Sequence, residues 1–470
     1  MSLSSSSPTT AAADAAGRAA AVPPPSAPAP VGLREALRFW LMLGFISFGG
    51  PAGQIAIMHR ELVERRRWIS EKRFLHALNY CMVLPGPEAQ QLATYLGWLM
   101  HRTRGALVAG GLFVLPSLLV LIGLSWLYMA LGQHPLVAGL FFGIKPAVIA
   151  VVAQAAWRLG KRTLRHPVLW LIAVAAFAAV ALLHLPFPLV VVGAALAGLL
   201  GARIVPAAFA SGGGHGVAAG SGLPALIDDH TPTPAHARFS RARLATVLGA
   251  GALLWLLPMA ALLALQGAQG TLPQMGWFFT KAALLTFGGA YAVLPYVHQG
   301  AVLHHGWLSA TQMIDGLALG ETTPGPLIMV VAFVGFVGGW NSPDLAALLG
   351  PGQALTAGVI AAVLVTWFTF LPSFLFILAG GPLVESTRGH VALGGPLTAI
   401  SAAVVGVILS LALVFGRQVL LPQGLAAGPD AAALGLALAA AVALFSGRLG
   451  VIPVIGLSAL AGLVLTLSRG

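Results

Sequence analysis

Long apolar stretches without charged residues recur along the whole chain. Three clear examples cover residues 106–131, 359–380 and 396–415. Each is long enough to cross the ~30 Å hydrocarbon layer as a helix, and none alternates polar and apolar residues as a membrane β-strand does. The pattern predicts an all-α polytopic membrane protein. The predicted spans are residues 105–131, 136–158, 166–183, 187–203, 244–266, 352–380, 392–416, 430–446 and 450–467.

A second pattern is an internal repeat at a constant spacing. FGGP at residues 48–51 returns as FGGA at 287–290, and PGP at 85–87 returns at 324–326, both 239 residues later. Each copy therefore interrupts its apolar helices twice, once at Gly-Gly and once at Pro-Gly-Pro. In a membrane chain, paired broken helices in two repeats indicate a transport site.

The repeat divides the chain into four parts. Residues 1–32 are rich in Ser, Ala and Pro and contain no apolar core segment, so they predict a disordered tail and not a signal peptide. Residues 33–203 and 274–470 hold the two repeats. Residues 204–273 combine a polar, Gly-rich linker, expected to be flexible, with a connecting transmembrane helix at about 244–266.

Composition excludes several protein classes. The 470 residues are 58% hydrophobic and only 8% charged, whereas a soluble domain carries about 25% charged residues. The net charge of +12 does not indicate nucleic acid, because the basic residues occupy short loops between spans. A single cysteine, Cys81, excludes an internal disulfide and a multi-thiol metal site. Because no nucleotide-binding or catalytic motif stands in a plausible context either, we expect no metal, no cofactor and no enzyme activity.

Loop charge predicts opposite orientations for the two repeats. The loop 59–73 contains six Lys and Arg residues, and the matching loop 298–312 contains none. Basic loops stay in the cytoplasm, so the copies should be inverted in the inner (plasma) membrane of a bacterium. If the broken segments dip in and return, loops 59–73, 158–165 and 203–243 are all cytoplasmic. This re-entrant arrangement is favoured, and one with crossing segments and up to 13 spans stays open.

The breaks themselves suggest a ligand. Where a helix begins, its first N–H groups have no internal partners and the axis dipole is positive. Inside a membrane such backbone must line a cavity or meet protein groups, and an oxyanion suits it best. The candidate substrate-binding residues are Ser47, Gly49, Gly50, Pro51, Gln54, Pro85, Gly86, Pro87, Gln91, Thr286, Gly288, Gly289, Thr323, Pro324, Gly325 and Pro326.

Charged residues in or beside apolar helices are candidates for proton coupling or for neutralising an anion. They are Glu88, Glu321, Lys145 and Lys281. Glu88 can instead complement the helix dipole, and either lysine can extend its ammonium group to the interface. His59 and His298 hold matched positions, expected outside the membrane core, where a proton-sensing role is an alternative to simple hydration. The basic run 64–73 predicts an amphipathic surface helix.

The motifs together resemble the chromate transporter family in its two-domain form. The resemblance rests on SFGGPAGQIAIM at residues 47–58, WIS at 68–70, LPGPEAQQLATYLGWL at 84–99, and the second-half TFGG and TTPGP. It covers about residues 33–203 and 274–467 and implies chromate efflux driven by the proton motive force, giving chromate resistance. The positions it implies to be sensitive are Gly49, Gly50, Pro51, Gln54, Pro85, Gly86, Pro87 and Gln91. Ala290 replaces Pro51 and Leu327 replaces Glu88 in the second copy, so the halves are not chemically equal.

Chromate itself does not follow from the residues. Sulfate has the same tetrahedral shape and charge, so an importer of sulfate or a related oxyanion, or a passive anion channel, remains an alternative. The expected partners are the oxyanion and the lipid bilayer. The oligomeric state stays open, a homodimer included.

Overall fold

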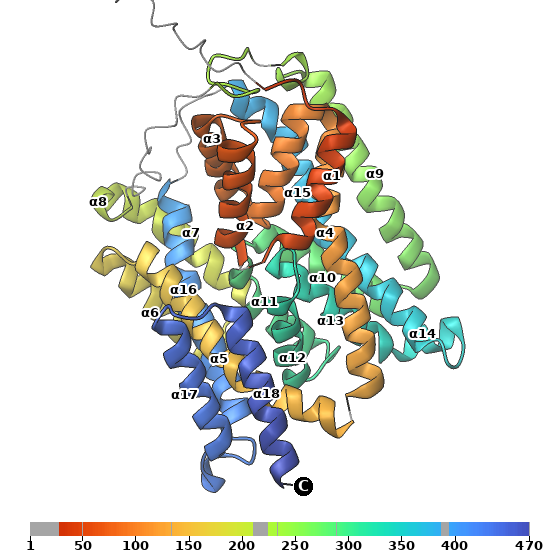
Figure 1. Cartoon of the computed structure of the whole chain (residues 1–470), viewed down its shortest axis with the longest axis vertical. Coiled ribbons are helices and arrows are strands. Elements are labelled where there is room, and N and C mark those ends of the chain that lie inside the picture. Colours follow the sequence, from red (N-terminus) through yellow and green to blue (C-terminus); the bar gives the residue numbers. More distant parts are fainter. Residues whose placement is uncertain are drawn as a thin grey trace, which may run out of the picture.

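The computed structural model describes residues 28–469 apart from 49, 133, 210–223, 233, 288 and 387–393. These residues form helices and connecting loops, with one isolated bridge between Ile69 and Ile227 (Figure 1). Seven helices in this part are long and apolar enough to cross a membrane, which confirms the all-α polytopic class. An eighth candidate is the segment of residues 327–349, which bends by 67°.

The first half begins with two short broken helices and continues with long ones. Its elements are α1 (Leu33–Ile46), α2 (Gly50–His59), the π-helix η1 (Arg60–Arg65), α3 (Glu71–Val83), α4 (Glu88–Leu131), α5 (Pro135–Thr163), α6 (Pro167–Ala181) and α7 (Phe187–Ile204). The short helix α8 (Pro206–Phe209), η2 (Ala235–Ala237) and the connecting helix α9 (Arg241–Gln266) follow. Helix α4 is kinked where Arg102 adopts a φ of 58°.

The second half repeats this order. Its elements are α10 (Thr271–Leu285), η3 (Ala290–Ala292), α11 (Leu294–Val297), the π-helix η4 (His298–His304), α12 (Ala310–Thr322), η5 (Leu327–Met329), α13 (Val330–Trp340), α14 (Pro343–Leu349), α15 (Ala354–Ser386), α16 (Gly394–Leu420), η6 (Leu425–Ala427), α17 (Ala431–Phe445) and α18 (Val451–Arg469). Helices α13 and α15 together correspond to α4. The π-helices match in position, and Ser70 and Ser309 of the repeated Trp-Ile/Leu-Ser motif cap α3 and α12.

All nine predicted spans are helices, but two are short. Helices α6 and α17 have 15 residues each, which is about 22 Å at 1.5 Å per residue. They are therefore shorter than the ~30 Å hydrocarbon layer. The other seven predicted spans coincide with the seven long apolar helices.

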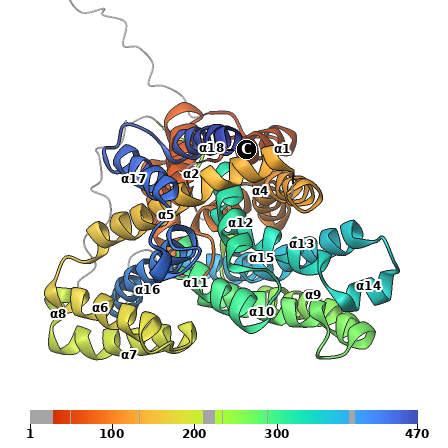
Figure 2. The same ribbon diagram turned by 90° about the horizontal axis from the view of Figure 1, so that it is seen from below.

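The two halves interlock by exchanging one helix each. Helix α5 of the first half packs against α17 and α18 of the second, while its counterpart α16 packs against α6 and α7 of the first (Figure 2). Helices α4 and α15 also pack against each other. Because most of the contact surface of α5 and α16 lies in the opposite half, neither half buries its apolar faces alone.

The broken helices lie on opposite sides of the two halves. In Figure 1, α1, α2 and α3 occupy the upper part of the molecule, while their counterparts α10, α11 and α12 lie lower down. Helices α1 and α2 have 14 and 10 residues, so neither crosses ~30 Å alone. This arrangement agrees with inverted, re-entrant segments.

One prediction about the basic surface was wrong. The run 64–73 is not one amphipathic helix: η1 ends at Arg65, a loop follows, and α3 begins at Glu71. The described part of the linker runs beside this loop. The N–H groups of Ser70, Leu226 and Ile227 form backbone hydrogen bonds between the two segments. Residues 210–223 lie outside the described residues.

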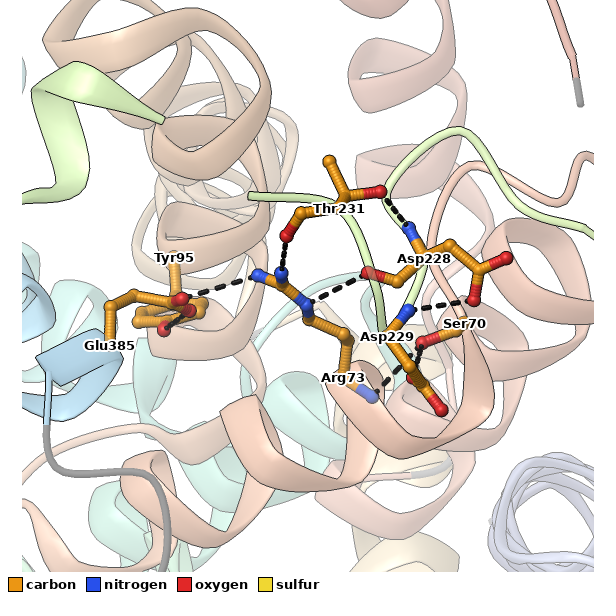
Figure 3. Close-up of polar contacts among 7 residues, drawn as sticks. All are labelled: Ser70, Arg73, Tyr95, Asp228, Asp229, Thr231 and Glu385. Carbon is orange, nitrogen blue, oxygen red and sulfur yellow. Dashed lines mark hydrogen bonds and ion pairs between the residues drawn. The ribbon is translucent and has the colours of Figure 1, made fainter. Parts of the chain in front are cut away.

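A buried arginine holds the linker to both halves (Figure 3). Arg73 on α3 pairs with Glu385 at the end of α15 at 3.2 Å, with the arginine side chain 6% and the glutamate 2% exposed. Its Nε donates to the carbonyl of Asp228 at 3.2 Å, and another nitrogen donates to the carbonyl of Thr231. The Tyr95 hydroxyl donates to Glu385 at 2.6 Å. One basic residue predicted to lie on the surface thus joins three segments far apart in sequence.

The inverted arrangement predicts opposite labelling of two matched loops. A cysteine at His304, which is exposed, should react with a membrane-impermeant thiol reagent added to intact cells. A cysteine at Arg65, whose side chain is 68% exposed, should react only after the cells are opened. The native Cys81 is buried and serves as the unlabelled background. Labelling of Arg65→Cys in intact cells would contradict the re-entrant arrangement.

Candidate functional site

The structure joins the four helix breaks in two pairs. The Gly86 N–H of the first Pro-Gly-Pro donates to the Thr286 carbonyl at 2.7 Å, and the Gly325 N–H of the second donates to the Ser47 carbonyl at 2.8 Å. Gly86 and Gly325 are equivalent positions of the two repeats, and so are Ser47 and Thr286. Each bond therefore joins a glycine of one half to the segment before the Gly-Gly break of the other half. Each Gly-Gly break therefore meets the Pro-Gly-Pro break of the opposite half, and we call these two meeting points together the crossing.

Glycine is required at each described break by backbone conformation. Gly50, Gly86, Gly289 and Gly325 have φ values of 69°, 126°, 102° and 101°. An L-residue with a side chain is disfavoured there, so the sequence places glycine at all four turns. Gly49 and Gly288, also predicted to bind substrate, lie outside the described residues.

The expectation of free amide donors at every break needs correction. The amides of Gly86 and Gly325 are used to tie the two halves together. The helix starts after them differ: α4 begins at Glu88 and η5 at Leu327, each after a proline and without a side-chain cap among the described residues. Their first N–H groups are therefore the donors that remain available to a ligand.

Polar side chains crowd the crossing. Ser47, Gln54, Gln91, Thr286 and Thr323 are all at most 5% exposed. The amide nitrogen of Gln54 donates to the carbonyl of Gly325 at 2.5 Å, and that of Gln91 donates to the carbonyl of Pro85 at 2.8 Å. These bonds place both glutamines against a Pro-Gly-Pro turn.

Several oxygens there have no partner among the described residues. They are the hydroxyl of Ser47 and the side-chain carbonyls of Gln54, Gln90 and Gln91. An unsatisfied polar group in a membrane interior costs several kcal/mol, so this cluster calls for water or a polar ligand. Sequence reasoning missed Gln90, which directly precedes Gln91 in the same motif.

A cavity of about 600 Å³ lies beside the first Pro-Gly-Pro break, with Glu88, the residue after Pro87, in its wall. It lies between α2, α3 and the end of α5, and Glu88, Arg162, His59, Arg60 and Glu71 line it. We call it the Glu88 cavity. His59 is fixed in its wall by Glu71 at 2.5 Å and Glu64 at 3.2 Å. Two arginines, Arg60 and Arg162, and three carboxylates, Glu64, Glu71 and Glu88, line the cavity, so acidic and basic groups face the same space.

A second cavity, of about 780 Å³, adjoins the equivalent elements of the other half. Lys281, His298, Gln299, His304 and His305 line it, and we call it the Lys281 cavity. His298 and Gln299 match His59 and Arg60 of the Glu88 cavity. His298 is 5% exposed, so it is not a solvated residue as expected. Ser47 and Thr286 line neither cavity.

The electrostatics of the Lys281 cavity depend mainly on its lysine. His305 lies in the loop after η4, outside the long apolar helices, and stacks flat on Trp307 at 4.3 Å. Burial lowers the pKa of His305 to about 4, and the nearby His304 and Lys281 add to this effect. His305 is therefore neutral near pH 7, and Lys281, which lies over the Trp277 ring at 5.7 Å, is a cationic group of the wall.

The remaining candidate charges already have partners. Glu321 accepts a hydrogen bond from the Tyr291 hydroxyl. Lys145 lies 3.6 Å from Asp315, which also accepts from the Tyr128 hydroxyl at 2.9 Å. Sequence reasoning missed Asp315, although a single carboxylate within an apolar run of α12 is a signal for a functional or paired charge. Lys145 thus neutralises a protein carboxylate.

No group of three or more His, Cys, Asp or Glu residues that could hold a metal is present in the described residues. The arrangement is a buried polar site with hydroxyl, amide and backbone N–H groups around it. These groups suit a polar ligand held by hydrogen bonds.

Comparison with known proteins identifies relatives of the whole chain. Two segments, residues 34–199 and 273–463, match the chromate transporter family. The chromate transport protein of Pseudomonas aeruginosa is 32% identical over 95% of both chains. That of Cupriavidus metallidurans is 28% identical over 82% of this chain and 83% of its own, and a probable chromate transport protein of Synechococcus elongatus is 27% identical over 82% and 85%. No solved structure matches. The matched segments are the two interlocked repeats that build the crossing, and the chain therefore belongs to the chromate transporter family.

Proposed function

We propose that the protein is a secondary transporter that exports chromate from the bacterial cytoplasm through the inner membrane and confers chromate resistance. The observation that carries the proposal is the crossing, where two oppositely placed pairs of helix breaks meet around unpartnered polar groups. Helix starts without side-chain caps suit an oxyanion. Relatives named as chromate transport proteins support chromate as that anion.

A carrier fits the geometry better than a channel. Ser47 and Thr286 are fully buried, and neither lines the Glu88 cavity or the Lys281 cavity. A channel needs a continuous aqueous path, whereas a carrier exposes its site to one side at a time. In this proposal the Glu88 cavity is the cytoplasmic vestibule and the Lys281 cavity the external one. The interlocked helices α5 and α16 make movement of one half depend on the other.

Glu88 is the residue best placed to couple chromate to protons. It is the first residue of α4 and lines the Glu88 cavity, near Arg162. An ionised carboxylate at this helix start competes with a dianion for the same N–H groups, because both are negative. Protonation of Glu88 removes the competitor, so proton and anion occupancy become linked.

Glu88→Gln should therefore uncouple transport from pH. In proteoliposomes loaded with radiolabelled chromate, we expect efflux through wild-type protein to change with an imposed pH gradient. Efflux through Glu88→Gln should not respond. Glu321→Gln is the matched variant, because Glu321 is bonded to Tyr291 and lines neither cavity. If both variants respond to the gradient as wild type does, the assignment of coupling to Glu88 is wrong.

A cell-based experiment tests the proposed function as a whole. Cells that express the protein are loaded with radiolabelled chromate, and its loss is followed with and without an uncoupler. We expect faster loss than in control cells, abolished by the uncoupler, and growth at higher chromate concentrations. Expression that makes cells more sensitive to chromate would indicate an importer. Conductance in planar bilayers at channel rates, without proton dependence, would indicate a channel.

A further inference from the structure

A third repeated motif lies within the long helices α4 and α15, away from the Gly-Gly and Pro-Gly-Pro breaks. Leu115-Pro116-Ser117 in α4 returns as Leu371-Pro372-Ser373 in α15, 256 residues later. The spacing exceeds that of the breaks because α14 and its loops intervene in the second half. Each proline lies within a long helix, where it removes one N–H donor and frees a carbonyl one turn earlier.

Each serine of this motif lies against the Pro-Gly-Pro break of the opposite half. A Cβ atom on Gly325 would lie 2.7 Å from the Cβ of Ser117, and a Cβ on Gly86 would lie 2.6 Å from the hydroxyl of Ser373. The two serines therefore occupy equivalent positions around the crossing. These serine contacts run from one half to the other, as the backbone bonds of Gly86 and Gly325 do.

The two hydroxyls are not used for local structure. In a helix, a serine or threonine hydroxyl commonly donates to the carbonyl four residues earlier, as Thr94, Thr286 and Thr369 do in the same region. Ser117 is fully buried, and its hydroxyl has no partner among the described residues. The hydroxyl of Ser373 is 1% exposed and, within the part of the chain that the structure describes, only accepts a long hydrogen bond of 3.5 Å from Gln91. Both therefore keep an O–H available for a ligand.

We infer that Ser117 and Ser373 are substrate-binding residues that donate hydrogen bonds to a tetrahedral oxyanion at the crossing. This inference rests on the proposed function and adds two donors that the break motifs do not contain. A tetrahedral XO₄²⁻ ion has two-fold axes, so it can present one pair of oxygens to each half of a site with two-fold pseudosymmetry. Hydroxyl groups from α4 and α15 then bind the anion without adding a fixed charge, which lets it leave again.

The test measures chromate flux in proteoliposomes of phosphatidylethanolamine and phosphatidylglycerol. Ser117→Ala and Ser373→Ala should each raise the KM for chromate by about tenfold, because each removes a hydrogen bond to a charged group. The maximal rate should fall much less. Ser117→Thr keeps a hydroxyl and should stay within about threefold of the wild-type KM.

Ser125→Ala is the matched control. Ser125 lies on the same helix, is equally buried and has an unpartnered hydroxyl, but it does not approach either Pro-Gly-Pro glycine. Its KM should match that of wild type. The melting temperature of each purified variant is measured in parallel, so that misfolding is recognised and the comparison is made with folded protein.

The outcomes separate this inference from the proposed function. If wild-type protein carries no chromate or sulfate, the proposed function fails and the serine assignment falls with it. If wild-type protein carries chromate and the double variant Ser117→Ala/Ser373→Ala keeps its KM, only the serine assignment is overturned. An equal rise in KM for Ser125→Ala also overturns it, because the effect would then come from helix packing.

Discussion

Gly86→Ala and Gly325→Ala should each reduce chromate efflux by at least about tenfold. Both glycines have φ values that side chains disfavour, 126° and 101°, which costs about 1–2 kcal/mol. An added Cβ would also lie within 2.7 Å of Ser373 or Ser117, and such overpacking costs typically about 1–3 kcal/mol. A free-energy cost of ~1.4 kcal/mol lowers the population of the native geometry about tenfold. Efflux, which needs that geometry at the crossing, should fall by at least the same factor. Efflux from loaded cells is the measurement.

Two other glycines provide controls. Gly123 lies in α4 at an ordinary helical position, and an added Cβ there has no atom within 4 Å. Gly123→Ala should leave efflux unchanged. Gly50 has a φ of 69° but open space around it, so Gly50→Ala should cost only the free energy of placing a residue with a side chain at a positive φ. Gly50→Asn should cost less still, because asparagine tolerates this conformation better. Full efflux by Gly325→Ala would show that the crossing tolerates displacement.

Arg73→Met should produce the largest loss of stability among single substitutions of a charged residue. It removes the guanidinium that lies 3.2 Å from the Glu385 carboxylate, 2% exposed, and frees the linker carbonyls of Asp228 and Thr231. Removing one member of a buried ion pair costs about 3–5 kcal/mol. Thermal unfolding of the detergent-purified protein measures the effect.

A double-mutant cycle distinguishes the ion pair from simple packing. Arg73→Met with Glu385→Gln should be more stable than Arg73→Met alone, because the buried carboxylate that lost the arginine is then replaced by a neutral amide. Arg65→Met is the control, since Arg65 is 68% exposed and its partner Glu61, 8% exposed, also has Arg66 at 3.7 Å. Its loss should cost less than that of Arg73, because Glu61 keeps a cationic neighbour. If the double variant is no more stable than Arg73→Met, the buried pair is not the cause.

The helical segments were predictable because their signals are local. The length of the apolar stretches alone predicted nine spans, and each of them is a helix in the structure. Glycine and proline predicted the positions of the breaks, because of the backbone conformations that these residues allow or prevent. The repeat at 239 residues also showed that each break has a counterpart. Residue type did not predict where Arg73 would lie, because the same basic residue serves on a surface or in a buried pair.

The sequence by itself determined that this is a helical membrane protein made of two related halves, each broken at a Gly-Gly and a Pro-Gly-Pro segment. Those properties depend on hydrophobicity and on φ preferences of neighbouring residues. Only the tertiary structure decided that Gly86 meets Thr286, that Ser117 meets Gly325 and that α5 and α16 are exchanged. These contacts join residues about 200 or more positions apart, so their energies come from packing between segments that no local pattern describes.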